Sequence, residues 1–479
     1  MSLTAAEIVA ALTDLLGPDQ VDTDAEQLRA ASIDRFRKYE DIHGVSSRPL
    51  PAAIAYATST EQVSRVLAFA NAHGVAVIPR TGRSATEGGL ETAVENSVVL
   101  DGSRMDAILS VDPVDMQVTA QCGVGLQTLD DLLQAQGLTT GHSPQSKPLA
   151  QLGGLVATRS IGQLSTLYGG IEDMVVGLEA VLPSGEVVRI KNVPRRAAGP
   201  DIRHLVIGNE GALCFITEVT VKVFRYTPEH NVYLGYTLDS MAEGFAILRE
   251  VMVAGYRPSV ARLYDVPDGA FHFAHFAKDR CVLIFVAEGN ERIARATGEG
   301  IDALVTARGT CEAVDGELVA AWFGRLNWGP EQIAAERDEI RQSGSIGFTT
   351  EVSGGWSVIH EIYQAVCARM RAEVPSLEMV GGHSSHSYLN GTNMYFVYYY
   401  GVGDCPPELE AERLHTPINA LICEETLRLG GSIVHHHGIG KARTPWVQAE
   451  YGSSYVLLTA VKAALDPNGI MNPGTVIPL

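Results

Sequence analysis

The chain has 479 residues, of which 46% are hydrophobic and 19% charged, a composition typical of well-packed globular proteins. This length is too large for one ordinary core and predicts more than one structural unit. The formal net charge of −20 disfavours nucleic acid or an anionic membrane surface as a partner, and no apolar run is long enough to span a bilayer.

The first residues predict a helix and not a secretion signal. Thr4 and Glu7 have the spacing of a capping box, an apolar stripe at helical spacing follows them, and Gly17-Pro18 ends the pattern. The seven cysteines are scattered and form no CxxC pair, as expected for reduced thiols. Together these features predict a cytoplasmic protein without disulfides or a cysteine-bound zinc ion.

Short strand-like runs alternate with helical runs up to about residue 228. The expected strands and helices there are strands at 52–57, 75–80, 98–100 and 117–122, helices at 60–74 and 126–137, a hairpin at 175–190 and a long β segment at 212–224. Further strands are expected at 231–238, 281–289 and 394–402, with helices between them, as in an antiparallel sheet of α+β type. A last helix is expected at 447–464.

Three glycine-containing motifs are candidates for a phosphate-binding loop. CGVGLQT at 122–128 has two of the three glycines of a dinucleotide fingerprint and is better explained as a tight strand-to-helix turn. Gly440-Lys441 lacks the other residues of a Walker loop. PRTGRSATEGGL at 79–90 follows a strand and is rich in small residues, which suits an anion-binding loop, although a surface turn is equally compatible with it.

A longer glycine-rich block spans 141–186 and contains GHSP, LGG, ATRS and YGGIED. With PRTGRSATEGG, GPDIRHLVIGNEGAL, HHHGIGK and DPNGIMNPG it resembles the PCMH-type FAD-binding proteins of the vanillyl-alcohol oxidase superfamily over nearly the whole chain. Within that superfamily the chain is most similar to alkyl-dihydroxyacetone-phosphate synthase and bacterial FAD-linked oxidoreductases. It is more distantly similar to D-lactate, glycolate and D-2-hydroxyglutarate dehydrogenases.

The resemblance implies an α+β fold in which a two-subdomain PCMH-type FAD-binding domain is joined to a cap (substrate) domain with an antiparallel sheet flanked by helices. The expected divisions are an N-terminal helical segment at 1–47, the FAD-binding domain at 48–228, the cap domain at 229–430, and a C-terminal segment at 431–479. This last segment is expected to return to the FAD-binding domain and to carry the histidine cluster.

The resemblance also implies FAD as the cofactor, held by backbone groups and small side chains. Members with covalent flavin place His or Cys in the first loop, and neither occurs in residues 79–90, so FAD is expected to be non-covalent. The expected contacts are Pro79, Arg80, Thr81, Gly82, Arg83, Ser84, Ala85, Pro144, Gln145, Ser146, Gln151, Gly153, Gly154, Ala157, Thr158, Arg159, Ser160, Ile161, Glu210, Gly211 and Ile216.

The synthase branch implies the reacting residues. These are expected to be Tyr395, His436, His437, Arg337, Arg262 and His142. Arg337 corresponds to the arginine that holds an acidic group of the substrate, and Arg262 to one that supports the His437 region. Histidine and tyrosine suit proton transfer, and an arginine fork suits a carboxylate or phosphate. Taken singly, Tyr395 could be a core residue and Arg337 a surface charge.

The block HHHGIGKAR at 435–443 places three histidines in a row. In an extended segment neighbouring side chains alternate, so His435 and His437 would share one side and His436 the other, which disfavours one metal ion bound by all three. In the metal-dependent relatives a glutamate stands at the position of His436 and a histidine at that of Tyr395, while His386 is retained. We therefore expect no metal, and we expect His435 to matter least.

Two activities remain open. The first is a dehydrogenase that oxidises a small D-2-hydroxy acid, a sugar acid or a related polar alcohol by hydride transfer to flavin N5, with an external acceptor such as an electron-transfer flavoprotein or a quinone. The second is an alkyl-dihydroxyacetone-phosphate synthase-like transferase without net redox change. A fatty chain requires membrane access, and no basic amphipathic segment supports it, so a small polar anionic substrate is favoured. Relatives are often dimers, which makes a homodimer the expected assembly.

Overall fold

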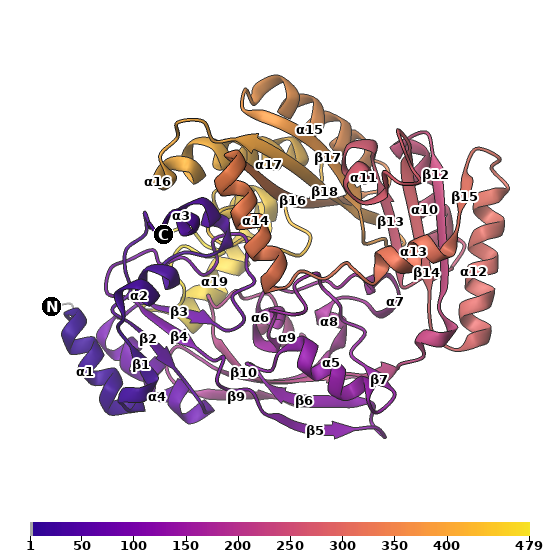
Figure 1. The fold of residues 1–479 in the computed structure, drawn as a ribbon. Coiled ribbons are helices and arrows are strands. Elements are labelled where there is room, and N and C mark those ends of the chain that lie inside the picture. The colour runs from indigo at the N-terminus through magenta and orange to yellow at the C-terminus, as the bar shows by residue number, and fades with distance from the viewer. Residues whose placement is uncertain (1–2) are drawn as a thin grey trace.

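The computed structural model describes residues 3–479, which form three main β-sheets and a short two-stranded ribbon (Figure 1). The first sheet has the strand order β1-β2-β4-β3, with β2, β4 and β3 parallel. Its strands are β1 (Val21–Asp22), β2 (Ala53–Tyr56), β3 (Val77–Arg80) and β4 (Val98–Asp101). The helices beside it are α1 (Ala5–Leu16), α2 (Ala25–Ala31) and α4 (Thr60–His73), and α3 (Lys38–His43) follows α2 in the sequence. Thr4 and Glu7 form the predicted capping box of α1.

The second sheet is antiparallel, with the order β5-β6-β10-β8-β9. Its strands are β5 (Ile108–Asp112), β6 (Gln117–Gln121), β8 (Val175–Val181), β9 (Val187–Ile190) and β10 (Phe215–Lys222), and β7 (Leu138–Thr139) pairs with β11 (Phe224–Arg225). The helices here are α5 (Leu126–Gln134), α6 (Leu152–Ala157), α7 (Ser165–Tyr168), α8 (Ile171–Met174) and α9 (Arg203–Val206). Gly125 is the N-cap of α5, which confirms CGVGLQT as a strand-to-helix turn.

The third sheet has seven antiparallel strands in the order β15-β12-β14-β13-β17-β18-β16, at the top of Figure 1. Its strands are β12 (Val232–Leu238), β13 (Val260–Tyr264), β14 (Cys281–Ala287), β15 (Glu312–Val314), β16 (Ser345–Gly355), β17 (Leu377–Ser384) and β18 (Gly391–Gly401). Its helices are α10 (Met241–Val253), α11 (Val266–Phe273), α12 (Glu291–Thr306), α13 (Gly316–Phe323), α14 (Pro330–Ser343), α15 (Ile359–Glu373), α16 (Pro407–Glu410) and α17 (Thr416–Arg428). The mixture of helices with largely antiparallel sheets confirms the α+β fold.

The two faces of the third sheet have different roles. Apolar side chains of α10, α12, α15 and α17 pack with those of the strands into the largest hydrophobic core. On β18, Met394 and Phe396 point into this core, whereas Tyr395 and Val397 line a cavity on the other face. This period-2 alternation is what a strand imposes on its side chains. The sequence MYFVYYYGV therefore supplies core and cavity residues from one strand.

The C-terminal segment packs against the first sheet. Met471 forms a parallel bridge with Val77 of β3, and both are fully buried in the core of that sheet. The single helix expected at 447–464 is wrong in detail: α18 (Val447–Tyr451) and α19 (Tyr455–Leu465) are separated at Gly452, whose φ of 52° lies outside the helical region. No helix within residues 3–479 has both the length and the apolar character needed to cross a bilayer.

Candidate active site

A cavity of about 730 Å³ lies between the third sheet and the other two. Loops that follow β3 and precede α6 line one side of it. The strands β13, β17 and β18 line the other side, and residues of the histidine block border it as well. The cavity therefore brings together segments that lie far apart in the sequence.

The predicted cofactor-binding segments converge on this cavity. The residues that line it are Pro79, Arg80, Thr81, Gly82, Arg83, Ser84, Ala85, Pro144, Gln145, Ser146, Gln151, Gly153, Gly154, Ala157, Thr158, Ser160, Ile161, Glu210, Gly211 and Ile216. Arg159 is the exception, because its half-exposed side chain pairs with Glu172 at 3.3 Å. The loop after β3 also touches the loop before α6, since a Cβ at Gly82 would lie 2.6 Å from the Leu149 carbonyl oxygen.

The chemistry of this side of the cavity fits FAD. Among residues 3–479, the backbone N–H groups of residues 82–87 donate to no protein acceptor, so they remain free for a pyrophosphate. The buried Gln151 Oε1 and Gln163 Nε2 also lack a partner there, and they suit the polar edge of a flavin. Arg83, Arg159 and Glu210 adopt positive φ values of 57°, 56° and 48°, and such strain concentrates at functional sites.

The histidine block is a turn, and the expectation of alternating faces is wrong. The buried carboxylate of Glu351 on β16 accepts hydrogen bonds from the backbone N–H groups of His435, His436 and His437, the last at 2.8 Å. One carboxylate can reach three successive N–H groups only if the backbone curves around it. The three imidazoles consequently lie close together, and Gly438 follows with a φ of 89°.

Tyr395 connects two of these histidines. Its Oη lies 2.5 Å from His436 Nε2 and 3.4 Å from His437 Nε2. Burial, together with the neighbouring imidazoles of His437 and His435, holds the pKa of His436 well below 6.5. Burial also raises the pKa of Tyr395 above its usual value of 10. Both side chains are therefore neutral at physiological pH. A proton can pass between Tyr395 and His436 without either group being ionised beforehand.

Three acidic side chains, of which Glu87 and Glu351 are buried, hold the block in place. Glu210 accepts the N–H groups of Ile439 and Gly440, both at 2.7 Å, so its carboxylate is engaged with this loop although the residue borders the cavity. Glu87 forms a two-pronged ion pair with the fully buried Arg443 at 3.0 Å. With Glu351, these contacts make the histidine turn rigid.

Arg262 lines the cavity beside Tyr395. Its side chain is 3% exposed, and its Nε and Nη1 atoms have no protein partner among residues 3–479. Its Nη2 lies 3.3 Å from Nε2 of His383, whose Nδ1 is 2.6 Å from the Asp268 carboxylate. The His383 ring stacks on the Tyr395 ring with centroids 4.7 Å apart. Arg262 thus lines the cavity next to Tyr395 and carries two buried nitrogens without a protein partner.

Two predicted catalytic residues do not reach the cavity. Arg337 lies on α14, its side chain is 39% exposed, and its guanidinium pairs with Asp41. Arg337 therefore does not line the cavity, whereas Arg262 does. His142 is buried behind the cavity wall, with Nε2 3.2 Å from Ser160 Oγ, and burial lowers its pKa to about 4. It can orient Ser160, which lines the cavity.

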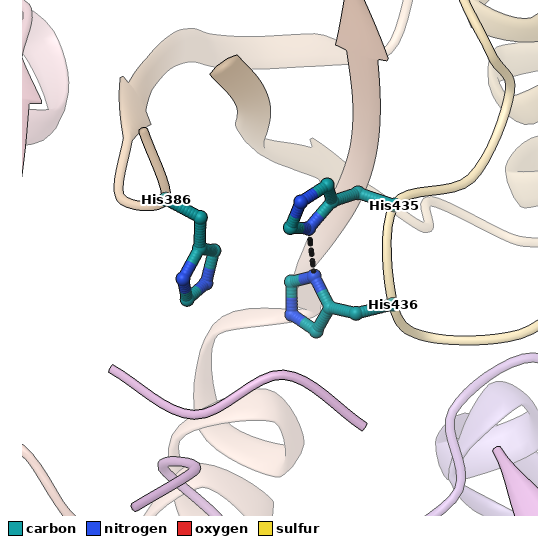
Figure 2. Close-up of side chains that lie close together, drawn as sticks. All are labelled: His386, His435 and His436. Atoms are coloured by element: carbon teal, nitrogen blue, oxygen red, sulfur yellow. Dashed lines mark hydrogen bonds between the residues drawn. The ribbon is translucent and has the colours of Figure 1, made fainter. Parts of the chain in front are cut away.

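His386, His435 and His436 offer ring nitrogens within 4.8 Å of one another, and Figure 2 shows the three rings facing a common centre. The Nδ1 atoms of His435 and His436 are 2.8 Å apart, a normal hydrogen-bond distance. Two imidazole nitrogens on one tetrahedral ion, each at about 2.05 Å, would stand about 3.3 Å apart. The geometry suits a hydrogen-bonded pair, and the absence of metal stays a prediction.

Several site residues were not found from the sequence. Glu351, Asp268 and Gln163 carry no motif, and His383 and Tyr388 lie in the block 382–396 without having been assigned a role. Strand pairing could have identified His383, because it lies directly across from Tyr395 in the register of β17 and β18. That register requires knowledge of which strands pair, which short apolar runs do not provide.

Comparisons with known proteins agree with this geometry. Residues 51–191 match the FAD binding domain family, and residues 227–476 match the C-terminal domain of FAD linked oxidases. The chain is 64% identical to the FAD-linked oxidoreductase YgcU of Escherichia coli K12 over all of both chains. It is 28% identical to alkyldihydroxyacetonephosphate synthase of Caenorhabditis elegans, over 89% of this chain and 76% of that one. It is 27% identical to the mitochondrial D-lactate dehydrogenase [cytochrome] of Arabidopsis thaliana, over 90% and 74%.

Solved structures share the fold over almost the whole chain. A structure of alkyldihydroxyacetonephosphate synthase has a TM-score of 0.75 at 22% identity, over 98% of this chain and 85% of that one. That of 4-ethylphenol oxidase from Gulosibacter chungangensis has a TM-score of 0.80 at 16% identity, over 99% and 97%. The chain therefore belongs to the FAD-linked oxidoreductases, with FAD as its cofactor.

Proposed function

We propose that the protein is a dehydrogenase of a small anionic alcohol, such as a D-2-hydroxy acid or a sugar acid, and that it passes electrons to an external acceptor. The observation that carries this proposal is the buried guanidinium of Arg262, a cavity-lining residue in which two nitrogens have no protein partner among residues 3–479. A buried cation without a partner is costly, and a carboxylate would satisfy it with a two-pronged ion pair. The substrate is therefore expected to supply the missing anion.

The surrounding residues can carry out the proton half of the reaction. When bound, FAD supplies the acceptor for the hydride that leaves the substrate carbon. Arg262 would fix the carboxylate, which places the neighbouring hydroxyl near Tyr395. Tyr395 Oη would accept the hydroxyl proton while it gives its own proton to His436 Nε2, 2.5 Å away. The paired transfer avoids a tyrosinate, which burial disfavours.

A synthase-like transfer without net redox change is the second candidate. Phe271, Trp328 and Ile333 give the cavity an apolar stretch that could take part of a longer chain. Arg35 and Lys38 interrupt this stretch, and both pair with Glu336, at 2.9 and 2.7 Å. Because charged groups oppose burial of an alkyl chain, we rank the small polar substrate first. The relative named D-lactate dehydrogenase [cytochrome] supports an external acceptor for this chain as well, such as an electron-transfer flavoprotein or a quinone.

Anaerobic reduction of the bound flavin tests the proposal. The purified protein is mixed with D- and L-2-hydroxy acids and sugar acids, and loss of the flavin absorbance is followed. Loss with one class of anionic alcohol, together with a large effect of Arg262→Gln on that reaction, supports a dehydrogenase. Exchange of the acyl chain of an acylated ketone phosphate, with no reduction by any alcohol, would establish the synthase-like reaction instead.

A further inference from the structure

A second cavity of about 300 Å³ lies on the far side of the histidine turn. Tyr388 and His435 line it, and its rim includes Asn390 and Gly430, which are exposed, so it communicates with solvent. The large cavity is lined by Tyr395 and His436 and shares no lining residue with the second one. The two cavities are thus separated at His435 and His436, whose rings touch.

An unbroken series of hydrogen bonds crosses this partition. Tyr395 Oη lies 2.5 Å from His436 Nε2, His436 Nδ1 lies 2.8 Å from His435 Nδ1, and His435 Nε2 lies 2.8 Å from Tyr388 Oη. Figure 2 shows the central contact between the two imidazoles. Each imidazole uses both of its nitrogens in the series, which is the arrangement required to pass a proton through a ring.

We propose that His436, His435 and Tyr388 form a relay that carries the substrate's hydroxyl proton from Tyr395 to water in the second cavity. In the resting state Tyr395 donates to His436 Nε2, His436 Nδ1–H donates to His435 Nδ1, and His435 Nε2–H donates to Tyr388. The substrate O–H bond breaks and a Tyr395 O–H bond forms. Each later group gains one proton and gives up another, and Tyr388 releases its proton to water. One proton enters and one leaves, so no group in the series changes its charge.

The electrostatics of the turn explain why such an exit is needed. Burial lowers the pKa of His435 to about 3 and holds that of His436 well below its usual value. A proton that arrives on His436 therefore cannot stay there as an imidazolium. Arg443 is a further positive charge that opposes a proton stored on His436. Passing the proton on removes the charge, and the second cavity is where water is available.

The inference rests on the proposed function only in taking Tyr395 as the group that receives the hydroxyl proton. His435→Ala and His435→Asn separate a relay from a purely structural role. In both variants the substrate should reduce the flavin at least about 10-fold more slowly than in the parent. The Asn variant should be slow as well, because an amide at position 435 can hydrogen-bond but cannot pass a proton. Added imidazole should restore the Ala variant, in which it can enter the vacated space, and should leave the Asn variant slow. Unchanged rates in both variants, or equal slowing without rescue of the Ala variant, would overturn the relay.

Tyr388→Phe tests the exit. It should slow flavin reduction, whereas Asn390→Ala at the rim of the same cavity should not, because Asn390 takes no part in the series. Equal effects of the two changes would point to a disturbed cavity wall and not to a relay. If no alcohol reduces the flavin of the parent protein, the proposed function is wrong. The hydrogen-bonded series is then still tested by NMR of the substrate-free protein.

NMR of the substrate-free protein with isotope-labelled histidine gives a readout independent of turnover. Tyr388→Phe removes the acceptor of His435 Nε2–H, so the imidazole N–H signals of both His435 and His436 should shift if the bonds are coupled. A His436 signal that does not respond would contradict the series. The same sample is assayed for metal. If it holds stoichiometric metal, and the imidazole N–H signals are absent until a chelator is added, the ring nitrogens bind an ion and the relay is refuted.

Discussion

Tyr395 Oη lies 2.5 Å from His436 Nε2 and 3.4 Å from His437 Nε2, so one hydroxyl joins two imidazoles at the wall of the cavity. Replacing Tyr395 with Phe keeps the ring and its stacking on His383 but removes this hydroxyl. We expect kcat to fall about 10²-fold or more with little change in KM, because a proton-transfer group is lost and the anion-binding Arg262 is not. Stopped-flow flavin reduction and steady-state kinetics measure the two effects.

Tyr399 provides the matched control for this change. It lies four residues further along β18, on the same face of the strand, and also lines the cavity. Its hydroxyl makes no side-chain hydrogen bond to the residues that the structure describes. Tyr399→Phe should therefore alter kcat by less than about 2-fold, as expected for a substitution that removes no interaction. A comparable loss in both variants would show that any tyrosine on this face matters for packing, and would remove Tyr395 from proton transfer.

A second prediction concerns Arg262. Arg262→Gln should raise KM for an anionic substrate by about 10- to 100-fold, the value of a hydrogen-bonded charge. Without ligand the variant should be at least as stable as the parent, because an unpaired buried charge has been removed. Oxalate, a small dianion, should raise the melting temperature of the parent and not that of the variant. Melting curves with and without oxalate complement the kinetics.

Arg337→Gln is the control for Arg262, and it also tests the assignment made from the sequence. Its partner Asp41 is half-buried and the ion pair is close to the surface, so its loss should change stability by no more than about 1 kcal/mol. KM should remain within about 2-fold of the parent value, as for a surface change. A 10-fold rise in KM for Arg337→Gln, with Arg262→Gln unaffected, would reinstate Arg337 as the substrate anchor.

The sequence is informative about local elements and about the cofactor. Helix caps, apolar periodicity and turn residues identify most strands before residue 228 to within two or three positions, because these signals act between near neighbours. The loops of FAD binding also follow from short motifs, since a pyrophosphate needs free backbone donors and small residues wherever it binds. Of the expected cofactor contacts, Arg159 alone does not line the cavity.

The arrangement of the reacting groups depends on contacts between distant segments, which local patterns do not encode. The histidines of HHHGIGK do not alternate between two faces, because Glu351, 84 residues before His435, draws three successive N–H groups around one carboxylate. The position of Arg337 outside the cavity likewise depends on a distant partner, since Asp41 on α3 lies far away in sequence. The carboxylates of Glu351 and Asp41 thus determine where the histidine turn and Arg337 lie, and neither carboxylate belongs to a recognisable sequence motif.

A third prediction is that FAD is released intact when the protein is denatured. Residues 79–90 contain neither His nor Cys, so this loop offers no nucleophile for a covalent link to the flavin. Acid precipitation should leave a colourless pellet and a yellow supernatant with the chromatographic retention of free FAD. Flavin fluorescence that travels with the polypeptide on a denaturing gel would contradict the prediction and would direct attention to another residue at the cavity wall.

The last prediction uses a histidine outside the site, His415, which is 3% exposed and packs edge-on against Phe348 at 4.0 Å. Burial lowers its pKa to about 3, against an ordinary value of 6.5. Between these two values the unfolded chain binds a proton that the folded protein refuses, so stability is full above pH 6.5 and falls as the pH decreases toward 3. At pH 5 this group alone should lower the free energy of unfolding by about 2 kcal/mol relative to pH 7.

His415→Leu fills the same apolar site without a titrating group and removes an Nδ1 atom that has no partner among residues 3–479. Its urea midpoint should therefore fall less between pH 7 and pH 5 than that of the parent. Replacing His275 with Gln should leave the parent pH dependence intact, because its side chain is exposed and lies outside the apolar site that holds His415. Parallel curves for the parent and His415→Leu would mean that the folded protein accommodates a charged His415, and the acid sensitivity would then have to arise from the buried histidines of the active-site turn.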